Sequence, residues 1–129
     1  MGKKFRIITN NPLVEKELGQ ENEVEYYDVS YEEILKIVRD QVYANCRLLS
    51  HPLSGSVKPN ETPYKSVMVA ADAKQLDFQS VEIIEEAIGA CGKFEKKWER
   101  YKLNQSVFED FQLIDYTLIS SAVQSAEFY

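Results

Sequence analysis

The chain has 129 residues, a length typical of one domain, and its 21 acidic and 15 basic side chains give a formal net charge of −6. Hydrophobic residues make up 44% and charged residues 28% of the chain, which excludes intrinsic disorder. The acid excess argues against nucleic-acid binding, and two cysteines are too few for a disulfide scaffold. We therefore expect one domain over residues 1–129, in a reducing compartment.

The chain begins with alternating strand and helix patterns. The short β-branched run at 4–9 predicts a strand. Asn11 followed by Pro12 predicts the N-cap and the first residue of a helix that runs over 12–18. Residues 23–29 are rich in Val and Tyr and predict a second strand.

A second helix is predicted after Ser30, because Ser30 and Glu33 have the spacing of a capping box. Its apolar face recurs at intervals of three and four residues, at Ile34, Leu35, Val38, Val42 and Cys46. Residues 47–51 then predict a short third strand.

The second half of the chain starts with an irregular segment at 51–64, and a fourth strand is predicted over 65–71. A helix is expected from Ser80 to about Trp98, with a kink or an early stop where Gly89 and Gly92 weaken it. The last helix is predicted over 107–123, with its apolar face at Val107, Phe111, Ile114, Leu118 and Ala122.

This order of elements predicts an α/β fold, a three-layer sandwich with a small mixed, mostly parallel sheet like half of a Rossmann or flavodoxin fold. The fourth strand follows the third through a loop, so we expect it to be antiparallel. If the first strand lies between the second and the third, a switch point opens beside it, where ligands bind in such sheets. Asn10, Asn11, Ser50 and His51 follow the two strands concerned.

The segment at 51–64 holds three of the four prolines and the only histidine, which indicates an ordered loop with a function. We interpret 50–66 as a site for a small anion such as a carboxylate, an amino acid or a phosphate, with the N-terminus of the helix at Pro12 as its floor. A rigid structural loop and a partner-binding surface are the alternatives. The candidate ligand-binding residues are Asn10, Asn11, His51, Ser54, Gly55, Ser56, Lys58, Asn60, Thr62 and Lys65.

An enzymatic alternative makes His51 a general acid or base in a small hydrolase or transferase that acts on a phosphorylated or acylated molecule. No acidic residue near it in sequence orients it, and no nucleophile elbow is present. A histidine bonded to its own loop is the simpler interpretation.

Other patterns predict little chemistry. Cys46 and Cys91 with a single histidine do not make a typical zinc site, so we expect buried cysteines and no metal. Glycine-rich nucleotide motifs are absent, and we expect no cofactor. Basic residues around Trp98 are explained by cations at a helix C-terminus. The short apolar run near the start is not a signal peptide or a membrane span, so we expect a cytoplasmic protein without membrane contact.

The central run over 48–66, LLSHPLSGSVKPNETPYKS, resembles the signature of the GrdX family. The similarity also covers 7–12, IITNNP, the stretch from Leu76-Asp77-Phe78 to Ile84-Glu85, and 111–115, FQLID, and so spans nearly the whole chain. Members of this family are encoded beside glycine, sarcosine and betaine reductase genes in amino-acid-fermenting anaerobic bacteria.

The resemblance implies an accessory, regulatory or assembly role for the glycine reductase system, with a reductase subunit as a partner. It implies no catalytic residue. We further expect that the chain can form a homodimer, through the last helix or the edge of the fourth strand.

Overall fold

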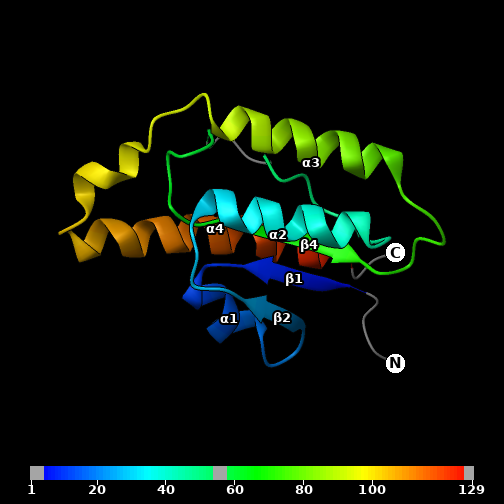
Figure 1. Cartoon of the computed structure of the whole chain (residues 1–129). Helices are drawn as coiled ribbons and strands as arrows, with labels where there is room; N and C mark the ends of the chain where they lie inside the picture. Colours follow the sequence, from blue (N-terminus) through cyan, green and yellow to red (C-terminus); the bar gives the residue numbers. More distant parts are fainter. Residues whose placement is uncertain (1–4, 54–57, 127–129) are drawn as a thin grey trace.

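The computed structural model describes residues 5–53 and 58–126 (Figure 1). The elements in chain order are β1 (Arg6–Thr9), α1 (Pro12–Leu18), β2 (Glu23–Tyr26), α2 (Tyr31–Tyr43), β3 (Arg47–Leu48), β4 (Ser66–Ala70), α3 (Phe78–Cys91), the 3₁₀ helix η1 (Lys97–Tyr101) and α4 (Gln105–Ala126). The predicted order of strands and helices is confirmed.

The four strands form one open mixed sheet in the order β2-β1-β4-β3. β1 pairs with β2 in parallel, and β4 pairs antiparallel with both β1 and β3. The predicted direction of β4 is confirmed, and the other three strands run the same way. A switch point was expected only if β1 lay directly between β2 and β3, and this condition is not met, because β4 inserts between β1 and β3. β4 therefore offers no edge for a dimer.

Helices cover both faces of this sheet, as the three-layer prediction requires. Strand residues alternate between the faces, so Ile8, Val67 and Val69 pack with α2 and α3. Ile7 and Met68 point the opposite way and pack with α1 and α4. Figure 1 shows α2 and α3 side by side over one face and α1 on the other. The two apolar layers hold the sheet rigidly between them.

The helix starts follow the predicted caps. The Asn11 side chain accepts a hydrogen bond from Leu13 N at 3.0 Å, and Ser30 Oγ accepts one from Glu33 N at 3.2 Å. α3 takes the early stop, because it ends at Cys91 before Gly92. Most of the basic residues around Trp98 therefore lie in η1 and its flanks, beyond the last turn of α3, and the dipole of that helix does not explain them.

The buried stripe of α4 differs from the predicted one. The expected stripe passes through Ile114, yet this side chain is 47% exposed, and the buried residues are Asp115, Ile119 and Val123. The predicted stripe is one position away from the buried one, because a stripe drawn through apolar residues leaves out Asp115. Hydrogen bonds from other elements decide the outcome.

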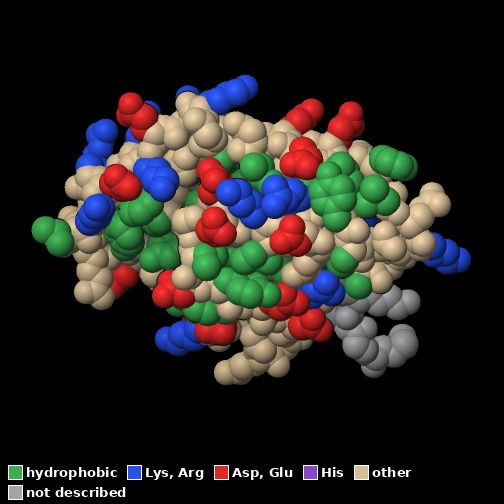
Figure 2. All heavy atoms as spheres, viewed as in Figure 1, with side chains coloured by type: hydrophobic (Ala, Val, Ile, Leu, Met, Phe, Trp, Pro, Cys, Tyr) green, Lys and Arg blue, Asp and Glu red, His purple; other side chains and the backbone are tan. Residues whose placement is uncertain are grey.

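The face seen in Figure 1 carries charged side chains of both signs. Figure 2 shows acidic and basic side chains interspersed on the face seen in Figure 1, with apolar side chains between them. In the described part of the chain, the helices are too short or too polar to cross a bilayer.

Candidate functional site

An asparagine that follows β1 holds the segment that leads into β4. The Asn10 amide donates to the carbonyls of Val29 and Pro63, both at 2.9 Å, and its Oδ1 accepts from Lys65 N at 2.8 Å. Asn10 is 5% exposed, so these bonds are shielded from water. The backbone of Lys65 is therefore held in one place at the carboxyl end of β1.

A buried carboxylate from α4 lies beside this point. Asp115 Oδ2 accepts hydrogen bonds from Ser66 Oγ at 2.7 Å and from Asn11 Nδ2 at 3.1 Å. Ser66 Oγ is also 2.7 Å from Thr9 Oγ1. Burial raises the pKa of Asp115, and the hydrogen bonds from Ser66 and Asn11 and the charge of Lys65 oppose that rise. Four elements thus meet at one carboxyl group.

A hollow, partly open to solvent, lies over these residues. Its empty volume is about 270 Å³ when the space open to solvent is included. The enclosed part measures only about 10 Å³, which is room for about one water molecule, so the hollow is shallow and mostly open. Its lining residues are Tyr31, Thr62, Tyr64, Lys65, Ile114, Asp115 and Leu118.

Lys65 is the unusual member of this lining. Its side chain is 6% exposed, and burial lowers the pKa of its ammonium group while the charge of Asp115 raises it. Within residues 5–53 and 58–126, Lys65 Nζ forms no hydrogen bond and no ion pair. A buried ammonium group is costly because part of its hydration is lost, and the charge of Asp115 offsets only part of this cost, since burial is the larger effect on the pKa of Lys65.

Hydroxyl groups complete the polar part of the hollow. Thr62 Oγ1 accepts from Tyr64 N at 3.2 Å, and Tyr64 Oη accepts from Gln112 Nε2 at 2.9 Å. Each of these hydroxyl groups keeps its own hydrogen for donation. Tyr31 adds a third hydroxyl group. Burial is the main cause of its raised pKa, so this group remains a neutral donor. The side chains of Ile114 and Leu118 supply an apolar wall.

Four of the residues predicted from the sequence meet at this hollow. Thr62 and Lys65 line it, while Asn10 positions Lys65 and Asn11 holds Asp115. The helix at Pro12 contributes through Asn11, its N-cap.

The other predicted residues lie elsewhere or outside the described part of the chain. Asn60 is buried and donates to the carbonyls of Cys91 and Phe94, which ties the loop to the end of α3. Lys58 is exposed. Ser54, Gly55 and Ser56 fall outside the described residues.

His51 is exposed, and its Nδ1 accepts a hydrogen bond from Leu53 N at 3.0 Å. This is the only hydrogen bond of the imidazole among the described residues, and it comes from the backbone of its own loop. The contact matches the simpler interpretation of His51, that of a histidine bonded to its loop.

Sequence reasoning did not select Asp115, Tyr31 or the apolar wall. A signal for Asp115 exists in the spacing, because it lies four residues after Phe111 and four before Ile119 on the same helix face. An acidic residue on an apolar face points to a buried polar partner. The partner itself comes from Ser66 and Asn11, which are distant in sequence.

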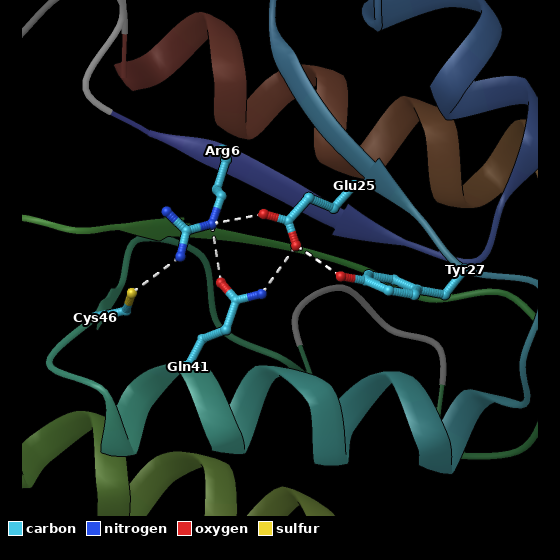
Figure 3. A network of polar contacts seen from close by, with 5 residues as sticks. All are labelled: Arg6, Glu25, Tyr27, Gln41 and Cys46. Atoms are coloured by element: carbon cyan, nitrogen blue, oxygen red, sulfur yellow. Dashed lines mark hydrogen bonds and ion pairs between the residues drawn. The ribbon is translucent and has the colours of Figure 1, made fainter.

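A second polar network lies at the opposite end of β1 (Figure 3). Arg6 Nε is 2.9 Å from Gln41 Oε1 and 3.0 Å from Glu25 Oε2, and Nη2 donates to Cys46 Sγ at 3.2 Å. Glu25 Oε1 accepts from Gln41 Nε2 and from Tyr27 Oη. Arg6 and Glu25 pair with each other, and Gln41 and Tyr27 both donate to Glu25, so we interpret this network as structural. The prediction of buried cysteines is confirmed, since Cys46 and Cys91 are both buried and free.

Comparison with known proteins gives one match. No curated protein and no solved structure was found to match the chain. A family model described as GrdX-like protein matches residues 6–124, which is nearly the whole chain and includes every residue of the hollow. The chain therefore belongs to the GrdX-like protein family.

Proposed function

We propose that this protein binds a small organic anion, a carboxylate or an amino acid, as a non-enzymatic accessory protein of the glycine reductase system. The reductase link rests on the gene neighbourhood that goes with the family. The binding role rests on one observation, the buried ammonium group of Lys65 at the wall of an open hollow. This position lies at the end of the 50–66 loop for which the sequence predicts an anion site.

A small anion compensates the buried charge of Lys65 further than Asp115 does. An ammonium group that has lost part of its hydration is destabilising, and a ligand carboxylate close to it adds to the compensation that Asp115 gives. The hydroxyl groups of Thr62 and Tyr64 add donors at the same wall. The hollow therefore favours a small anion over a neutral or cationic molecule.

A thermal-shift panel tests the binding role. The wild type is heated with acetate, glycine, sarcosine, betaine, acetyl phosphate and inorganic phosphate. A ligand at a hundred times its Kd stabilises the protein by about 2.7 kcal/mol, so at least one member of the panel should raise the unfolding midpoint. If none of them does, the binding role is wrong.

Variants separate the hollow from the outer part of the loop. Lys65→Met removes the buried cation with little change in volume, and we expect it to abolish the stabilisation. Lys58→Met tests the exposed loop residue that the sequence also predicts as a ligand contact. Lys74→Met, an exposed lysine after β4, is the matched control. Loss in Lys58→Met with full binding in Lys65→Met moves the site out of the hollow.

The accessory role has its own test. Purified reductase subunits are mixed one at a time with the protein and separated by size. Co-elution with one subunit, at a defined stoichiometry, supports the role. Elution of the protein on its own with every subunit contradicts it and leaves the binding role standing.

A further inference from the structure

A basic and an acidic side chain line the hollow together. This pair narrows the class of ligand that fits more than the buried lysine alone does. Lys65 and Asp115 both line it, and each is almost fully buried, at 6% and 5% exposure. Among the described residues they form no direct ion pair with each other. Two such groups facing one space are separately available to a ligand.

Asp115 is oriented by β4 and by the start of α1. Its Oδ2 accepts hydrogen bonds from Ser66 Oγ and Asn11 Nδ2, and the backbone of Ser66 also contributes a hydrogen bond to the carboxyl group. A carboxylate has about four acceptor positions, so the group keeps capacity for a donor that enters the hollow.

We propose that the ligand is a small amino acid in its zwitterionic form, with its carboxylate at Lys65 and its ammonium group at Asp115. This inference rests on the proposed binding function and names the ligand class. Thr62 and Tyr64 add hydroxyl groups to the lining, and Ile114 and Leu118 add apolar side chains against which a short side chain can pack. Phosphate and simple carboxylates lack the group that Asp115 recognises.

Asp115 suits this task because of its surroundings. Burial raises its pKa, whereas the ammonium group of Lys65 and the donors Ser66 and Asn11 favour the ionised form. Tyr31 is the other titratable group that faces it, and it stays neutral because its pKa is raised. A ligand ammonium group adds a second cation and favours the ionised carboxylate further. Asp115 is thus the specificity-determining residue of the site.

Three ligands with one carbon skeleton test the inference on the wild-type protein. L-alanine carries both charged groups, propionate lacks the amino group, and ethylamine lacks the carboxylate. Calorimetric titration should show alanine binding about tenfold or more tighter than propionate, since one charge-assisted hydrogen bond is lost. Ethylamine should give no measurable binding, because it meets Lys65 without an anion.

Two variants assign the preference to one carboxyl group. Asp115→Asn keeps an acceptor oxygen for Ser66 and Asn11, so the fold is retained, and replaces the other oxygen with an NH₂ group that cannot accept. Alanine affinity should fall to that of propionate, while propionate binding stays or improves. Asp110→Asn, an exposed acid on the same helix, should leave both affinities unchanged.

The outcomes separate the two proposals. Propionate binding as tightly as alanine in the wild type overturns the zwitterion and leaves the anion-binding function in place. An unchanged alanine preference in Asp115→Asn overturns the role of Asp115. The absence of binding by alanine, propionate, acetate and phosphate overturns both proposals.

Discussion

At the scale of single residues, the molecule places two ionisable groups in positions that cost it stability. Lys65 and Asp115 have pKa values shifted toward their neutral forms, chiefly by burial. A structural role alone does not require either charge, because well-packed apolar residues in their place are often neutral or stabilising. Groups of this kind cluster at functional sites, and these two share one hollow.

Asp115→Asn should change how stability depends on pH. The folded protein holds the Asp115 proton above its ordinary pKa of 3.8, and therefore more tightly than the unfolded chain does. The free energy of unfolding of the wild type should fall, relative to the variant, as the pH rises above that value, until the carboxyl group of the folded protein has ionised. Urea unfolding between about pH 4 and pH 8 measures this difference.

Asp110→Asn is the control for this experiment, since its exposed carboxyl group lies on the same helix. The free energy of unfolding of Asp110→Asn should depend on pH in the same way as that of the wild type across the whole range. Parallel curves for the wild type and Asp115→Asn would contradict the raised pKa.

At the scale of elements, the two ends of β1 have different tasks. The carboxyl end leads into the hollow through Asn10 and Asn11. The amino end joins β1 to β2 and α2 through Arg6, whose guanidinium group contacts Glu25, Gln41 and Cys46 (Figure 3). The first end is where we propose the ligand site, and the second end joins the strands to α2.

Arg6→Met should lower the free energy of unfolding by about 1–3 kcal/mol, because a partly buried ion pair and its hydrogen bonds are lost together. Arg47→Met is the matched control, since Arg47 contacts Asp72 at 2.9 Å with both side chains more than two-fifths exposed. A surface pair contributes about 0–1 kcal/mol, so this variant should stay near the wild type. Equal losses in the two variants would contradict the distinction. Chemical denaturation followed by circular dichroism measures both.

At the scale of the whole molecule, the sheet separates two apolar cores, and we expect them to unfold as one unit. Ile7 and Ile8 are adjacent in sequence and fully buried, and their side chains lie in different cores. One continuous sheet joins the two cores, so a substitution that destabilises one core should also destabilise the other.

Ile7→Ala and Ile8→Ala should each cost about 2–5 kcal/mol. In both variants, far-ultraviolet circular dichroism and the fluorescence of Trp98, the single tryptophan, should report the same urea midpoint. Trp98 packs edge-on against Phe108 of α4, so its signal follows the α1 and α4 side of the sheet. Separate midpoints for the two probes would show that the layers unfold independently.

Local patterns predicted most of the elements. The α1 helix begins at Pro12 and α2 follows Ser30 as expected, because an N-cap depends on residues three or four apart. The strand order was not predictable in this way. Whether β4 inserts beside β1 or pairs outside β3 depends on which long-range pairing buries more apolar surface, and β4 is buried at all five positions.

The sequence by itself determined the fold class and the family, and it predicted a site in the segment that ends at Lys65. Composition, periodicity and a long family signature are local or additive properties of the chain, so they can be read from the sequence without a structure. Only the tertiary structure decided that Asp115 faces inward and meets Lys65 at one hollow. A charged side chain is buried only where donors from distant parts of the chain satisfy it, and Ser66 and Asn11 do so 49 and 104 positions away.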